Sequence, residues 1–160
     1  MKVLAIDPGN EQSAYCIYDG DTKQTHASGK SPNTNLLFGL GAYYCADVKV
    51  MAIEMIACYG MPVGKTVFET CVWIGRFVQQ WAGEYKFVYR RDVKLHLCNS
   101  ARAKDSNVRQ ALIDRFPATG GGKTPQIGTK KQQGPLYGFK ADMWAALSVA
   151  ITYAETKGES

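Results

Sequence analysis

Three acidic residues border apolar segments that should be buried in the fold. Asp7 ends the apolar run 3–6 and is followed at once by Pro8-Gly9, and Glu54 ends the largely apolar run 48–53. Asp142 begins a long apolar helical pattern. An unpaired carboxylate is costly to bury, and neighbouring carboxylates repel unless a cation lies between them. Because hard oxygen ligands suit Mg²⁺ and Mn²⁺, the three acids predict a metal site.

The rest of the pattern predicts the elements that position these acids. Their order suits a ribonuclease H-like fold of the α/β class, a five-stranded mixed sheet with helices on both faces. Strands one to three form an antiparallel meander, and strands four and five run parallel to strand one. The predicted elements are strands over 2–7, 13–19 and 23–29, a helix over 35–46, a strand over 48–54, a helix over 66–82, a strand over 86–90, and helices over 92–98, 106–116 and 140–156.

This topology brings the acids to one edge of the sheet. Strands one and four are parallel neighbours, and open α/β sheets place ligands at the carboxyl ends of their strands. Asp7 and Glu54 should therefore meet. Asp142 shares a helical face with Ala146 and Val149, so we expect it to point at the protein rather than at solvent. Each acid also has an ordinary explanation, as turn chemistry or helix N-terminal electrostatics, but the three together favour the metal site.

A carboxylate cluster holding two metal ions roughly 4 Å apart is the usual apparatus for phosphodiester hydrolysis. Other chemistries have less support in this sequence. The five cysteines contain no Cys-x-x-Cys pair and His26 and His96 lie far apart, so neither a zinc site nor a Ser-His-Asp triad is expected. The segments 60–66 and 120–124 approach the P-loop pattern but miss its spacing, so we predict no nucleotide cofactor.

Positive charge is concentrated in one part of the chain. Residues 86–140 hold twelve Lys and Arg against three acids, a balance of +9, whereas the whole chain carries +5. Such a segment favours an anionic polymer as partner over a merely solvated surface. The loop after Glu54 could also contact unstacked bases or phosphate, although a plain connecting loop explains it as well. The candidate DNA-binding residues are Tyr59, Lys65, Arg90, Arg91, Lys94, Arg102, Lys104, Arg109, Lys130 and Lys131.

The helix over 66–82 has one apolar stripe, which includes Ile74 and Trp81 and should pack on the sheet. Trp73 and Phe77 fall among its polar residues. They predict a second contact, either with a partner subunit or under a neighbouring loop.

The composition predicts one domain over 1–160, with 118–137 as a mobile loop because it is rich in Gly, Pro, Lys and Gln. No apolar run is long enough to span a bilayer. We expect a cytoplasmic protein with reduced cysteines and no membrane partner.

The motifs Ile6-Asp7-Pro8-Gly9, Ala52-Ile53-Glu54 and Arg91-Asp92-Val93-Lys94, together with the final helix, resemble the RuvC family of Holliday junction resolvases in a form typical of bacteriophages. The resemblance implies a homodimeric Mg²⁺-dependent endodeoxyribonuclease of DNA recombination and repair. It would hold up to two ions per site, Mn²⁺ would substitute, and it would resolve four-way junctions by paired symmetric nicks in the host bacterial cytoplasm. It also implies metal binding by Asp7, Glu54 and Asp142, catalytic roles for Lys94 and Lys104, and a dimer interface at Trp73 and Phe77.

One position departs from this family pattern. The family usually carries a second acid one turn after the first on its last helix, where this chain has Ala145. Three alternatives therefore stay open. They are a broader fork or flap endonuclease, a non-catalytic junction-binding protein of the same fold, and an actin-like or sugar-kinase-type ATPase, which normally needs a second comparable domain.

Overall fold

The computed structural model describes residues 1–157. Its element order is the predicted one, with five strands and five helices in the described part of the chain. The elements are β1 (Lys2–Asp7), β2 (Gln12–Asp19), β3 (Gln24–Pro32), α1 (Asn33–Cys45), β4 (Val50–Met55), α2 (Lys65–Gln80), β5 (Glu84–Tyr89), α3 (Arg90–Cys98), α4 (Asp105–Ile113) and α5 (Met143–Thr156).

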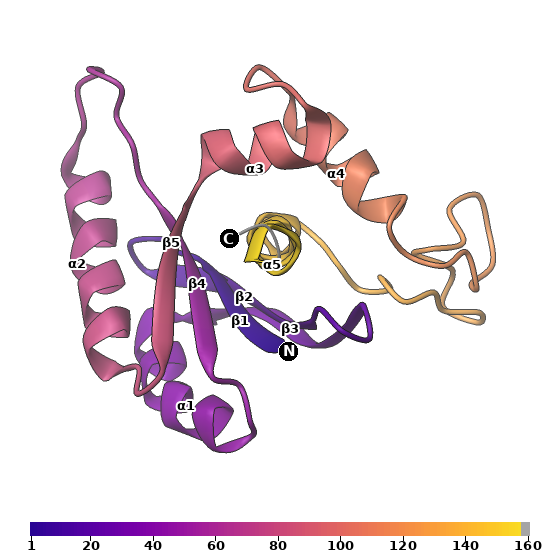
Figure 1. Cartoon of the computed structure of the whole chain (residues 1–160), viewed down its shortest axis with the longest axis horizontal. Coiled ribbons are helices and arrows are strands. Elements are labelled where there is room, and N and C mark those ends of the chain that lie inside the picture. The colour runs from indigo at the N-terminus through magenta and orange to yellow at the C-terminus, as the bar shows by residue number, and fades with distance from the viewer. Residues whose placement is uncertain (158–160) are drawn as a thin grey trace.

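The strands form one mixed sheet in the order β3-β2-β1-β4-β5. β1 pairs antiparallel with β2 and β2 with β3, whereas β1 with β4 and β4 with β5 are parallel pairs. The predicted meander and the two predicted parallel pairs are both confirmed. Side chains alternate across the sheet, so Val3 and Ala5 face one core while Leu4 and Ile6 face the other. Figure 1 shows the sheet between two helical layers, with α1 and α2 on one side and α5 on the other.

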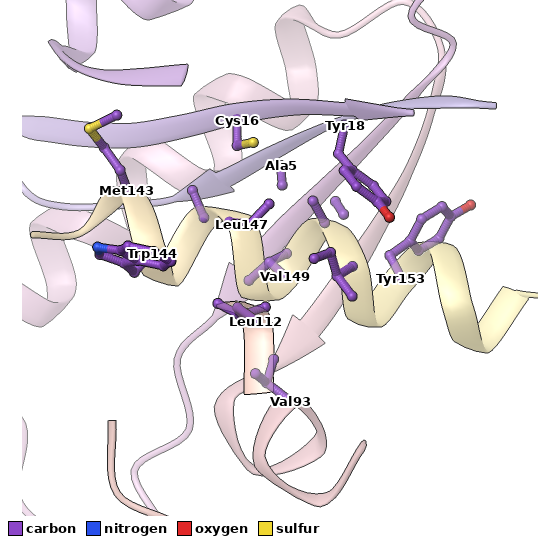
Figure 2. Close-up of a cluster of buried hydrophobic side chains, with 14 of the residues drawn as sticks. Ala5, Cys16, Tyr18, Val93, Leu112, Met143, Trp144, Leu147, Val149 and Tyr153 are labelled. Carbon is purple, nitrogen blue, oxygen red and sulfur yellow. The ribbon is translucent and has the colours of Figure 1, made fainter. Parts of the chain in front are cut away.

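α5 is the central helix of the core that contains Val3 and Ala5, here called the larger core; the core with Leu4 and Ile6 is the smaller core. Ala146, Leu147, Val149, Ala150 and Ile151 are all fully buried, because the sheet covers one side of the helix and α3 and α4 cover the other. Figure 2 shows side chains of β1 and β2 above α5, with Val93 of α3 and Leu112 of α4 below it. A helix that is apolar on all sides is stable only when enclosed in this way.

The buried face of α2 is wider than predicted. Thr70, Ile74 and Phe77 form its buried face, and Phe77 is fully buried in the smaller core. Phe77 therefore faces the sheet and is not available to a partner. The apolar residues left exposed are instead Phe68 and Val72, at 62% and 63%. The predicted apolar stripe is confirmed, since Ile74 and Trp81 are both buried in the smaller core, but the buried face also takes in Phe77.

All five helices begin one to three residues earlier or later than predicted, and the starts of α4 and α5 show local structure that accounts for the shift. α4 begins at Asp105, so Asn107 lies within its first turn, where its side chain accepts a hydrogen bond from the Lys104 backbone N–H at 2.9 Å. α5 begins at Met143 rather than 140, because Ala141 has a positive φ of 47° that interrupts helical geometry. No helix of residues 1–157 is long and apolar enough to cross a bilayer.

Candidate active site

Asp7 and Glu54 lie together at the carboxyl ends of β1 and β4. The parallel register pairs Ile6 with Ile53, so the next residue along each strand is an acid. Both side chains are partly buried, and both line one cavity of about 220 Å³. The predicted meeting of the two acids follows directly from the register. The other residues that line this cavity are Pro8, Met55, Ile56, Ala57 and Arg90.

The electrostatics of this cavity disfavour two negative charges. Burial, followed by repulsion from Glu54 and Asp142, raises the pKa of Asp7 to about 7, while Arg90 and Lys30 act in the opposite direction. Burial also raises the pKa of Glu54, against the opposing charge of Arg90. The site therefore binds protons more readily than an exposed pair of acids would, which is the expected behaviour of carboxylates that lack a cation.

The donor set of the pair suits a hard divalent cation. Neither carboxylate accepts a hydrogen bond from residues 1–157, so the oxygens that face the cavity remain available. Carboxylate oxygen is the ligand that Mg²⁺ prefers. However, no group of three or more His, Cys, Asp or Glu side chains in residues 1–157 lies close enough to hold one ion. In this arrangement Asp7 and Glu54 fit Mg²⁺ as a pair of protein ligands.

Asp142 is near this pair but turns toward a different partner. It is the residue before α5, its side chain is 52% exposed, and it accepts a hydrogen bond from Lys30 Nζ at 2.6 Å. The expectation that Asp142 points at the protein is therefore wrong in part. Its charge still raises the pKa of Asp7, so the two acids share one electrostatic environment. Lys30 comes from β3 and is 112 residues away in sequence, which left no local signal for the pair.

Arg90 lies between the two halves of the site, the Asp7–Glu54 pair and Asp142. It begins α3 directly after β5, forms an ion pair with Asp105 of α4, and donates a hydrogen bond to Ser148 Oγ of α5 at 3.4 Å. It lines the Asp7–Glu54 cavity and a second cavity of about 120 Å³ that also contains Asp105 and Asp142. Asp105 and Lys30 were not predicted as site residues, because neither ends an apolar run.

The predicted DNA-binding residues fall into two groups. Tyr59, Arg91 and Lys94 line an open cavity of about 460 Å³ that shares Arg90 with the acidic site. The positive charge of Lys94 opposes the raised pKa of Glu54. The residues of the second group do not line this cavity. Lys65 pairs with Glu69 within α2, and the guanidinium of Arg109 lies 4.6 Å from the centre of the Trp144 ring. The remaining exposed candidates are Arg102, Lys104, Lys130 and Lys131.

The strand order and the acidic pair at the carboxyl ends of β1 and β4 define the class of the fold as ribonuclease H-like. Within that class the chain has the RuvC fold. It superposes on Thermus thermophilus RuvC with a TM-score of 0.71 at 13% identity, over 99% of this chain and 96% of that chain. T. thermophilus RuvC in complex with Holliday junction substrate gives 0.69 at 12% identity, over 100% and 96%. No protein-family model and no curated protein matches the sequence.

Proposed function

We propose that this chain is a metal-dependent, structure-selective endodeoxyribonuclease that resolves four-way DNA junctions. One observation carries the proposal. Asp7 and Glu54 converge in one cavity at the carboxyl ends of adjacent parallel strands, with raised pKa values and with no hydrogen-bond donor among residues 1–157. The neighbour with the same fold, T. thermophilus RuvC, has been determined in complex with Holliday junction substrate, which supports branched DNA as the partner.

The residues of the site have separable roles. Asp7 and Glu54 would hold Mg²⁺, or Mn²⁺ in its place, and Asp142 would join them once it leaves Lys30. The bound ion would supply activation of water and neutralisation of phosphate charge. Lys94, whose charge already reaches Glu54, would orient the scissile phosphate and stabilise its developing charge. Lys104, exposed just before α4, would act similarly on the phosphate backbone.

Paired symmetric nicks require two active sites, and we propose a homodimer that uses the outer face of α2. Phe68 and Val72 are one helical turn apart and more than 60% exposed. Adjacent exposed apolar residues of this kind are typical of protein–protein contacts. Trp73 lies at the edge of this face, partly buried, with the Arg76 guanidinium 4.1 Å from its ring centre. Phe77 contributes from the core by fixing the orientation of α2.

A second candidate function is non-catalytic recognition of junctions. The observation that favours it is the exposed Asp142–Lys30 pair, together with the lack of a three-acid group in residues 1–157. A protein that had lost its metal would keep the basic surface and the fold. Cleavage of forks and flaps in addition to junctions is a broader form of the enzymatic proposal, since selectivity between branched substrates depends on dimer geometry.

One experiment separates these possibilities. A labelled four-way junction is incubated with wild type or Asp7→Asn in Mg²⁺ and in Mn²⁺, with linear duplex and fork as controls. The proposal expects paired symmetric nicks that Asp7→Asn abolishes. Equal cutting of forks would widen the substrate to branched DNA. Tight binding without cleavage in either metal would replace the enzymatic proposal with the binding protein.

A further inference from the structure

Residues 120–134, here named the basic arm, combine positive charge with a high glycine content. The segment contains Lys123, Lys130 and Lys131, five glycines and no acidic residue. All three lysines are exposed, and none forms an ion pair with any residue of 1–157. In Figure 1 the segment, drawn in orange, projects away from the sheet beyond α4. Its charge is therefore available to an external anion.

The basic arm is built by hydrogen bonds between its own two halves. The Gly120 N–H donates to the Pro125 carbonyl at 2.8 Å, and the Gly121 N–H donates to the Gln132 carbonyl at 2.9 Å. The Gly134 N–H donates to the Ile127 carbonyl at 2.9 Å. These contacts bring the start of the segment beside its end. Lys123 consequently belongs to the same small lobe as Lys130 and Lys131.

Glycine is required at the centre of this lobe. Gly128 has a φ of +81°, which residues with a Cβ rarely adopt. A Cβ at Gly128 would lie 2.3 Å from the backbone nitrogen of Gly134, and a Cβ at Gly134 would lie 2.3 Å from the Pro125 carbonyl oxygen. The backbone strands thus approach so closely that no side chain fits between them. The result is a lobe held together by its own backbone contacts.

The base of the basic arm is attached to the core beside the candidate site. Leu136 is fully buried in the larger core, and Ile127 packs against the same cluster. Phe139, three residues further on, packs with the Trp144 ring of α5 at a centroid distance of 5.5 Å. These anchors hold the lobe at a fixed position relative to the start of α5, where Asp142 lies.

We infer that the basic arm is a preformed clamp for the phosphate backbone of duplex DNA, placed outside the acidic cavity. The inference rests on the proposed function and specifies how the substrate is held. Exposed lysines without acidic partners bind phosphate independently of sequence and release counterions. Because the lobe is already folded, binding orders only the lysine side chains and not the backbone. The basic arm would bind the phosphates of one duplex branch of the substrate and orient that branch toward Asp7 and Glu54.

The test measures DNA binding without cleavage. Fluorescence anisotropy of a labelled duplex and of a labelled four-way junction is followed in EDTA over a series of salt concentrations. Replacing Lys123, Lys130 and Lys131 together with Gln should flatten the slope of log K against log salt by about three. The control replaces Lys23, Lys49 and Lys86 with Gln, which removes the same charge from exposed positions elsewhere. The control should keep the wild-type slope.

A second variant tests whether the lobe must be preformed. Gly128→Ala leaves every lysine in place but forces a Cβ into the contact with Gly134. Binding of duplex should weaken about tenfold, since the lysines then have to be ordered on binding. A thermal melt checks that the core is intact.

The outcomes separate the two proposals. If wild type binds neither DNA, the proposed function fails, and the arm fails with it. If wild type binds and the triple lysine variant keeps its slope, only the clamp is overturned. If Gly128→Ala binds as wild type does, the lysines still bind DNA but the preformed lobe is not needed.

Discussion

The two halves of the candidate site are positioned by different kinds of structure. Asp7 and Glu54 are fixed by the register of two parallel strands at the centre of the sheet, so they stay together despite their repulsion. Asp142 follows a residue of positive φ at the start of α5 and turns outward to Lys30. The strand register holds Asp7 and Glu54 in a partly buried site, whereas Asp142, at the start of a helix, is half-exposed and pairs with a surface lysine. This difference predicts how each acid responds to substitution.

The largest expected effect is the loss of cleavage in Asp7→Asn. The amide cannot supply a negative ligand oxygen, so we expect junction cleavage to fall by about a thousandfold or more. Single-turnover cleavage in Mg²⁺ measures this. The matched control is Asp19→Asn, an acid on the neighbouring strand but at the opposite end of the sheet. Equal losses in both variants would contradict a specific role for Asp7.

The same substitution should stabilise the metal-free protein. The pKa of Asp7 is raised to about 7 in the folded state, from the 3.8 of an ordinary aspartate side chain. Between these values the unfolded state releases a proton that the folded state retains, so wild-type stability falls as the pH rises from 4 to 7. Above pH 7 the penalty is complete, about 2–4 kcal/mol after allowance for solvent screening. Asp7→Asn should lack this decline.

Urea unfolding of the two proteins in EDTA measures that difference. At pH 8 the free energy of unfolding should be higher for Asp7→Asn, and near pH 4 the two proteins should be nearly equal. A variant that is less stable than wild type at pH 8 would mean that Asp7 contributes a favourable interaction in the absence of metal.

Asp142→Asn should have a smaller effect on cleavage and almost none on stability. Its side chain is half-exposed and its ion pair with Lys30 is on the surface, so its loss should change the free energy of unfolding by less than about 1 kcal/mol. Cleavage should fall by roughly 10–100-fold if Asp142 completes the metal site. Wild-type cleavage by Asp142→Asn would show that the strand pair acts alone.

The same division explains what the sequence could predict. The positions of Asp7 and Glu54 follow from apolar strands that end in acids and from the parallel pairing of β1 with β4, which are local patterns and a topology rule. The Asp142–Lys30 contact joins residues 112 positions apart and has no periodic signal. The folded basic arm is equally hidden, because backbone hydrogen bonds between glycines build it rather than an apolar pattern.

Arg90→Gln tests the residue that lies between the two halves. Its guanidinium opposes the raised pKa values of Asp7 and Glu54 and pairs with Asp105. Without it, the metal-free protein should lose about 1 kcal/mol of stability at pH 8. The loss should shrink at pH 5, where Asp7 retains its proton. Thermal melts of Arg90→Gln and the neighbouring control Arg91→Gln measure this. Similar losses at both pH values would assign Arg90 a packing role instead.

The smallest expected effect is that of Lys30→Gln on the requirement for Mg²⁺. Lys30 donates a hydrogen bond to Asp142, and its charge lowers the pKa of Asp7. It therefore competes with an added cation for both acids. Since an exposed ion pair contributes less than about 1 kcal/mol, the Mg²⁺ concentration that gives half of the thermal shift should fall about threefold. Lys23→Gln, in the turn before β3, is the control. A higher Mg²⁺ requirement in Lys30→Gln would reverse the argument, because Lys30 would then assist the metal site by holding Asp142 in position.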